Sequence, residues 1–212
     1  MFNKYLSNSY FSTILFILLY VSLLIGFYFD ENLNSGSYED WLRTNYPAIK
    51  GFAFDFKNSF LNYDDFGHRH SPVYLIFLSF FYKIGFSSDL LRLLHLHLAL
   101  FLIYYFFKCL KFKYTDINKN YLFVLAFVIF LSPTFRSLSI WPDTRIIGLI
   151  FFTVSVYQFL QFQKKGSIKN FWLCIISIIL SSYISPNFSL FIIFYYLYFL
   201  KNVAPKNILY SL

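Results

Sequence analysis

Long apolar runs separated by short polar stretches dominate the chain. The first run, residues 11–29, is interrupted only by small or hydroxyl-bearing residues. A helix that crosses the hydrocarbon core of a bilayer needs about 20 apolar residues, so this run is long enough to span it. Further apolar runs cover residues 90–107, 146–162, 171–184 and 188–200. The pattern predicts an all-α fold, a polytopic transmembrane helical bundle.

Several apolar runs, residues 72–86 and 121–131 among them, are shorter than a full span. The first of them is followed by Ser87-Ser88-Asp89, which is typical of a helix N-cap, so residues 90–107 form a separate helix. If both 72–86 and 90–107 crossed the membrane, every later link would change sides. We therefore expect 72–86 to dip into the bilayer or lie at an angle to it.

A polar stretch, residues 30–71, separates the first run from the rest. Residues 38–43 predict a short helix on the membrane surface, with Trp41 at the interface and Pro47 ending the helix. Residues 52–61 are amphipathic, and we expect them in the headgroup region. The stretch predicts an external first loop that contains short surface helices.

The basic residues are concentrated between the apolar runs. The chain is 58% hydrophobic and 13% charged, with a net charge of +8 and a mean hydropathy of +0.56. Lysines gather at 108–119, 164–169 and 201–206, which the positive-inside bias places in the cytoplasm. No basic patch interleaves with exposed aromatic residues, so the expected partner is the lipid bilayer and not a nucleic acid.

These features predict a single transmembrane domain over residues 1–212, with the 30–71 loop external and the N-terminus cytoplasmic. The first run lacks a small-residue cleavage site, because bulky aromatic residues follow Gly26, so we interpret it as a signal anchor. The expected location is the bacterial inner membrane, in a multi-pass arrangement. Cys109 and Cys174 indicate neither a disulfide framework nor a metal site.

Seven of the ten acidic residues lie in the 30–71 loop. Adjacent carboxylates raise one another's pKa, which suits a general base or a ligand of a divalent cation. The adjacent pairs are Glu39-Asp40, Asp64-Asp65 and Asp30-Glu31. Acid pairs in exposed loops also serve solubility alone, and this alternative stays open.

The loop ends in His68-Arg69-His70-Ser71-Pro72. Arginine binds phosphate oxygens through its fork of donors, and histidine donates to phosphate or accepts a proton near neutral pH. We therefore take Arg69 and His70, with Asp64 and Asp65, as candidate substrate-binding residues. The two acids and the two histidines fall within seven residues, which leaves a metal as an alternative, although the order matches no compact zinc pattern.

A second polar island, residues 132–145, interrupts the apolar sequence further along. It carries Arg136 and Asp143, which we expect to face the same cavity as the first loop. The alternative is an interfacial turn with arginines that extend to the headgroups. His95 and His97 are two residues apart on one helix, so they point to different faces, and we interpret them as helix-packing residues.

The order of these features resembles the GT-C superfamily of integral-membrane glycosyltransferases, which move sugars from polyprenyl phosphate. The likeness covers about residues 11–163 and includes the anchor, the acidic loop ending in Asp-Asp-Phe-Gly-His-Arg-His-Ser-Pro-Val-Tyr, and Leu-Ser-Pro-Thr-Phe-Arg before Asp143. Family members carry a catalytic carboxylate in the first external loop. The resemblance implies that Asp40 and Glu39 hold that position, with Asp30-Glu31 as the rival pair. It also implies that His70 and Asp143 line the cavity.

By this resemblance, a loop carboxylate deprotonates an acceptor hydroxyl, and Arg69, His70 or Arg136 holds the lipid phosphate, with or without a divalent cation. Family members have more helices, so we expect the N-terminal portion of a longer, truncated or split enzyme. Two alternatives stay open: a non-catalytic membrane subunit that works with a further membrane subunit, and a fragment of a lipid-linked glycan transporter or polymerase.

Overall fold

The computed structural model describes residues 9–32 and 36–202, and every regular element in this part of the chain is a helix. The elements are α2 (Ser9–Tyr28), α3 (Ser37–Asp40), η1 (Trp41–Asn45), α4 (Tyr46–Phe54), α5 (Phe56–Leu61), η2 (Tyr63–Phe66), α6 (Val73–Lys83), α7 (Ser88–Lys113), α8 (Lys119–Phe127), η3 (Val128–Leu131), α9 (Pro133–Ile140), α10 (Thr144–Lys165), α11 (Ile168–Ile184), η4 (Pro186–Phe188) and α12 (Leu190–Asn202). The predicted all-α bundle is confirmed.

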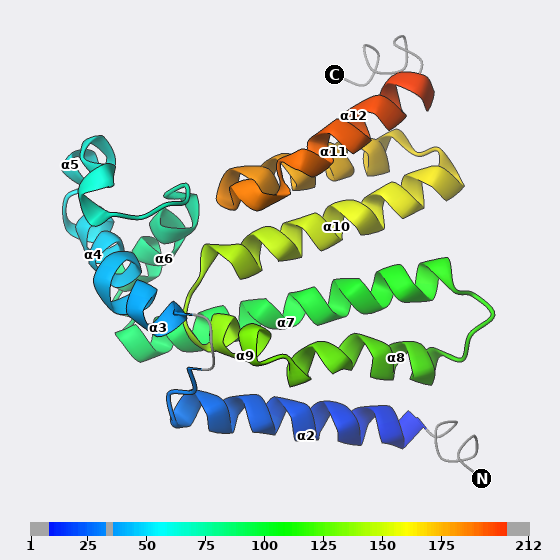
Figure 1. The fold of residues 1–212 in the computed structure, drawn as a ribbon, viewed down its shortest axis with the longest axis horizontal. Coiled ribbons are helices and arrows are strands. Elements are labelled where there is room, and N and C mark those ends of the chain that lie inside the picture. Colours follow the sequence, from blue (N-terminus) through cyan, green and yellow to red (C-terminus); the bar gives the residue numbers. More distant parts are fainter. Residues whose placement is uncertain (1–8, 33–35, 203–212) are drawn as a thin grey trace.

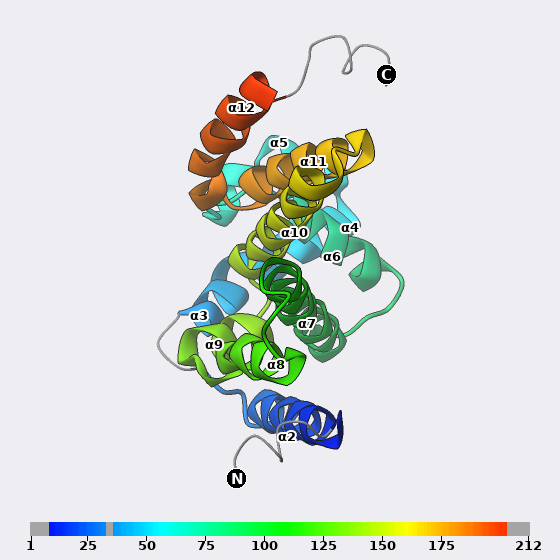
Figure 2. The ribbon, with the colours of Figure 1, turned by 90° about the vertical axis from the view of Figure 1, so that its right-hand side faces the viewer.

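The long helices form a row. Figure 1 shows α2, α8, α7, α10 and α11 side by side, and Figure 2 shows the same succession from the end. Each helix of the row packs against the next one, and α12 follows at the far edge. α2 and α12 lie at the two edges of the row, so large apolar side chains stay exposed along both helices. Such extensive apolar surface needs lipid to cover it.

Three helices are long and apolar enough to cross a membrane: Tyr10–Tyr28, Ser88–Lys113 and Thr144–Lys165. A fourth span is present if residues 119–131 and α9, which meet at a bend of 72°, count as one broken crossing. The bend falls at Ser132, whose side chain accepts from the backbone N–H of Phe135 and so caps α9. These helices indicate an integral membrane protein.

α6 does not belong to the row. It has 11 residues, so it extends about 16 Å, half the thickness of a hydrocarbon core. It packs against α4 and lies with the helices of the first loop (Figure 1). This placement agrees with the expectation that residues 72–86 do not cross. α7 begins after the expected cap, where Ser87 accepts from the N–H of Leu90, and it continues to Lys113, well beyond the expected end.

Two expectations for the first loop were wrong. Pro47 does not end a helix, because helical backbone continues from α3 through η1 into α4. η1 is a π-helical turn in which the N–H of Tyr46 bonds to the carbonyl of Trp41, and this wider turn accommodates the proline ring. Trp41 does not lie at an interface: it is 1% exposed and stacks on Tyr46.

Most acidic residues and the lysine-rich links lie at different ends of the fold. Helices α3 to α6, α9 and residues 141–145 gather at one end of the row, which we call the loop end. The links after α7 and α10 lie at the opposite end, which we call the lysine end (Figure 1). Lysines at the lysine end are Lys111, Lys113, Lys119, Lys164 and Lys165. The lysine-rich links agree with the positive-inside bias, but the loop end also carries Arg43, Lys50, Lys57, Arg69 and Lys83.

We predict that the loop end faces outward. In a variant without the two buried cysteines (Cys109→Ala, Cys174→Ala), Asn62→Cys should react with a membrane-impermeant maleimide on intact cells, and Ile117→Cys should react only after permeabilisation. Ile117 is exposed and carries no cap, whereas the side chain of the adjacent Asn118 caps α8. If Ile117→Cys reacts on intact cells and Asn62→Cys does not, the orientation is the reverse of the predicted one.

Candidate functional site

Three arginines from later helices hold three carboxylates of the first loop. Arg92 lies on α7, Arg136 on α9 and Arg145 on α10. The pairs are Asp30–Arg92, Glu31–Arg136 and Asp40–Arg145, with nearest N···O distances of 2.6, 2.5 and 3.5 Å. The partners of each pair are far apart in sequence, so these contacts fix the loop on the helices that follow it.

The Glu31–Arg136 pair is a two-point contact. Nε of Arg136 donates to Oε1 of Glu31 at 2.6 Å and Nη2 donates to Oε2, while the same guanidinium also donates to the hydroxyl and carbonyl of Ser22. Both charged side chains are largely buried, at 15% and 16% exposure. Arg136, a candidate for phosphate binding, is therefore engaged in joining α2 to α9, and it does not pair with Asp143.

Arg92 is the most buried of the three arginines. Its guanidinium carbon lies 3.6 Å from the ring centre of Trp141 and 4.8 Å from that of Phe27. It also contacts Asp89 on its own helix. The indole N–H of Trp141 donates to the backbone carbonyl of Glu31 at 3.1 Å. Trp141 thus lies between two of the three arginine contacts and links them.

Asp143, Arg145 and Asp40 form a chain of contacts from the interior to the surface. Asp143 is 4% exposed and is the N-cap of α10, where its Oδ1 accepts from the N–H of Arg145 at 2.7 Å. The Arg145 guanidinium donates to both oxygens of this carboxylate, at 2.6 to 3.1 Å. Its Nη2 also lies 3.5 Å from Asp40, whose side chain is 54% exposed. The buried acid holds the arginine, and the arginine holds the exposed acid.

The helix that carries Asp40 is attached rigidly at this point. The side-chain amide of Asn45 donates to the carbonyl of Pro142 at 2.9 Å, and both groups are buried. The ring of Tyr38 lies edge-on to Trp141 at 4.7 Å. These contacts fix the first helical turns of the loop beside the start of α10, which is how Asp40 comes to lie next to Arg145.

His68 and His70 lie at the C-terminal end of the first loop, close enough to Asp143 and Asp40 to interact with their charges. The hydroxyl of Tyr63 is 2.6 Å from Nδ1 of His68 and donates to the carbonyl of His70 at 2.8 Å. Burial lowers the pKa of both histidines below the ordinary value, although the nearby Asp143 and Asp40 carboxylates oppose the shift. Both imidazoles are therefore neutral near pH 7.

His70 has an unused polar atom. Its Nδ1 is buried and makes no hydrogen bond to any of the residues that the structure describes. Asp143, Arg145, Asp40 and Arg69 are the charged groups that act on it. A buried polar atom without a partner is costly, so a ligand with a hydrogen-bonding group would be favoured there.

His95, a buried residue of α7, links this helix to α6 and α9. Its Nδ1 is 2.5 Å from the hydroxyl of Tyr74 on α6, and its Nε2 is 2.8 Å from the carbonyl of Leu138 on α9. A carbonyl only accepts, so the proton is on Nε2 and the tyrosine donates to Nδ1. His97 points away and bonds to Tyr20 of α2 at 2.8 Å. The expectation of two helix-packing histidines is confirmed.

The other sequence candidates lie on the surface of the loop end. Glu39 pairs with Arg43 one turn away, at 3.0 Å, and both side chains are more than half exposed. Asp64 and Asp65, both in η2, and Arg69 are exposed. Among the described residues, no three His, Cys, Asp or Glu side chains are placed to hold a metal ion.

Sequence reasoning counted Arg145 in the second polar island without assigning it a role, and it missed Tyr63 as a site residue. The signal for Arg145 was its position two residues after Asp143 at the start of an apolar run, where an N-cap acid and an arginine of the first turn approach each other. Tyr63 gave no signal, because its role depends on the fold of residues 63–70. Comparison with protein-family models, curated proteins and solved structures finds no match to this chain.

We predict that Arg145→Gln destabilises the protein by about 2–3 kcal/mol, because it leaves a buried carboxylate without its partner. The value is at the low end for buried pairs, since the Arg145 side chain is 36% exposed and solvent screens it. The matched control, Arg43→Gln, removes an exposed pair and should cost less than about 0.5 kcal/mol. Unfolding titrations in mixed micelles measure both; equal losses would contradict the assignment.

We also predict a pH dependence. A histidine whose pKa is lower in the folded than in the unfolded state binds its proton preferentially when unfolded. Stability should therefore be constant above about pH 6.5, fall as the pH drops below that value, and level off below the folded-state pKa. Thermal unfolding of detergent-solubilised protein between pH 5 and 8 measures the effect. His70→Gln should reduce the pH slope, and an unchanged slope would show that His70 does not contribute.

Proposed function

We propose that the chain is a membrane glycosyltransferase of the GT-C kind, which transfers a sugar from a polyprenyl-phosphate donor to an acceptor hydroxyl at the loop end. The observation that carries the proposal is the chain of contacts Asp143–Arg145–Asp40. It fixes an accessible carboxylate of the first loop beside the start of a membrane-spanning helix. This is the arrangement that base catalysis on a lipid-linked substrate needs.

In the proposed reaction, Asp40 accepts the proton of the acceptor hydroxyl, and the resulting oxygen attacks C1 of the sugar. The bond between C1 and the phosphate oxygen breaks, and polyprenyl phosphate leaves with the electron pair. Asp40 suits the base because it is half exposed and lies 3.5 Å from its arginine, whereas Asp30 and Glu31 lie within 2.6 Å of theirs. Glu39 is the adjacent acid, although it already pairs with Arg43.

The phosphate of the donor would bind at the end of the loop. Arg69 is exposed, and the neutral His70 has a buried Nδ1 without a partner. An arginine fork and a histidine are suitable donors for phosphate oxygens. Arg136 has no comparable freedom, because Glu31 and Ser22 occupy its donors. Arg145 is placed to contribute positive charge while it stays bound to Asp143.

The test is sugar transfer in native membranes, where any further membrane subunit is also present. Membranes with and without the chain are supplied with radiolabelled polyprenyl-phosphate sugars, and the label that leaves the lipid fraction is measured. We predict that Asp40→Asn lowers transfer by about 10²–10⁴-fold, the usual loss for a general base. The variant should remain folded, because Asp40 is half exposed.

The matched control is Asp55→Asn on the same loop. Asp55 is exposed and caps α5 by accepting from the N–H of Asn58, a role that asparagine also fills. This variant should therefore transfer sugar at the wild-type rate. Full activity of both Asp40→Asn and the Glu39→Gln, Asp40→Asn double variant would show that another residue is the base. Equal transfer in membranes with and without the chain, for every donor, would refute the proposal.

A further inference from the structure

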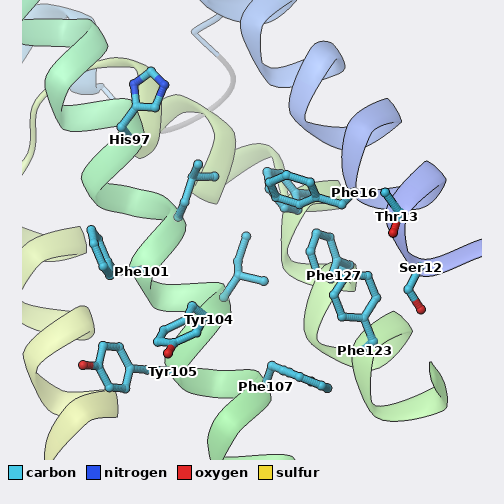
Figure 3. Close-up of a pocket in the computed structure, with 13 residues that line it drawn as sticks. Ser12, Thr13, Phe16, His97, Phe101, Tyr104, Tyr105, Phe107, Phe123 and Phe127 are labelled. Atoms are coloured by element: carbon cyan, nitrogen blue, oxygen red, sulfur yellow. The ribbon is translucent and has the colours of Figure 1, made fainter. Parts of the chain in front are cut away.

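An apolar crevice separates α2 from α7 within the membrane-spanning part of the row. It has a volume of about 800 Å³, within the range of sites that hold small ligands. α8 lies against both helices and closes the crevice on one side. Figure 3 shows α2 and α8 across the crevice from α7, with aromatic side chains from all three pointing into it. The aromatic residues that line it are Phe16, Phe101, Tyr104, Tyr105, Phe107, Phe123, Phe127 and Phe130.

Two polar contacts hold α2 at the two ends of this crevice. Towards the loop end, Tyr20 bonds to His97 at 2.8 Å, and towards the lysine end, the hydroxyl of Ser12 donates to Asn120 at 3.0 Å. Eight residues separate Ser12 from Tyr20, so these contacts are about 12 Å apart along the helix. Between them α2 stays away from α7, and the crevice persists because no side chain fills it.

The crevice opens into a polar hollow at the lysine end. This second hollow, about 770 Å³ in volume, shares Ser12, Phe107 and Phe123 with the first. Its other walls are the residues of the link after α7 and the first turn of α8, from Thr115 to Asn120. Lys119 and one carboxylate, Asp116, lie in this wall, and Lys111 and Lys113 on the last turn of α7 make the charge of this region positive overall.

We infer that this combined site binds one anionic glycerophospholipid, with an acyl chain between α2 and α7 and the headgroup phosphate at Lys119. Charge and polarity support this occupant. The apolar, aromatic crevice matches an acyl chain, and it continues without interruption into a hollow that has hydroxyl, amide and ammonium donors. Basic hollows between membrane helices at the positively charged end favour anionic headgroups. The site lies at the end of the row opposite Asp40, so the inference does not depend on the proposed activity.

The first experiment measures headgroup preference. The full chain, purified in mild detergent, is mixed with phosphatidylglycerol or phosphatidylcholine, and native mass spectrometry counts the lipid that stays bound. We expect one phosphatidylglycerol per chain, bound in preference to phosphatidylcholine. Lys119→Gln should lower that preference about fivefold, the effect of one cation near a lipid phosphate. The matched control is Lys169→Gln, at the start of α11 in the second basic link, and it should leave the lipid preference unchanged.

The second experiment locates the acyl chain. Phosphatidylglycerol with a diazirine on one acyl chain is photolysed in proteoliposomes, and the modified residues are mapped. Label should concentrate on the lining of the crevice, above all residues 12–16 and 100–107. Leu100→Trp fills the crevice and should remove this label, whereas Leu125→Trp, on the exposed face of α8, should not.

Three results would overturn the inference. One is equal binding of the two lipids together with no effect of Lys119→Gln. Another is label spread as densely over the exposed face of α12 as over the crevice, which would indicate ordinary boundary lipid. The third is unchanged labelling in a folded Leu100→Trp protein. If Leu100→Trp does not fold, the Lys119→Gln comparison decides alone, because Lys119 is exposed and its replacement disturbs no packing.

Discussion

The structure depends on the neutralisation of one acidic segment by three arginines that come much later in the chain. Asp30, Glu31 and Asp40 follow the first membrane helix directly, where unpaired carboxylates would repel one another. Arg92, Arg136 and Arg145 supply the opposite charges from three different helices. The Glu31–Arg136 pair is shielded from water and salt because both side chains are largely buried, whereas the Asp30 and Asp40 side chains are more than half exposed. These contacts attach the loop end to the helices of the row, while buried apolar residues such as Trp41, Ile49 and Leu75 form its core.

Within this framework the third pair differs from the other two. Asp30 and Glu31 lie within 2.6 Å of their arginines, but Asp40 lies 3.5 Å from Arg145, which is already bound to Asp143. Asp143 therefore makes the closer ion pair with Arg145, and Asp40 remains available for other contacts. The geometry thus separates the two acids that are held closely by an arginine from one acid that is held more loosely.

Hydrophobic periodicity was sufficient to predict the helices, because a lipid environment imposes length and apolarity on any crossing segment. Hydrophobic periodicity could not predict how η1 accommodates Pro47, because no residue type indicates the backbone geometry of a π turn. The site was predicted in part. Asp40 and Asp143 were named as candidates from the sequence, but the pairing of Arg136 with Glu31 and of Arg145 with Asp40 joins residues that are far apart in the chain. These pairings depend on how α9 and α10 pack against the first loop, which local sequence does not specify.

The long separation between the partners of each arginine pair has a consequence for biosynthesis. Asp30 and Glu31 leave the ribosome 62 and 105 residues before Arg92 and Arg136. At 5–20 residues per second, the Glu31 carboxylate waits about 5–20 s for its partner. During that time α7 is made as well, so Asp30 can pair with Arg92 before Arg136 reaches Glu31. The contacts of the loop end therefore form one after another, and the set is complete only when α9 and the start of α10 have been made.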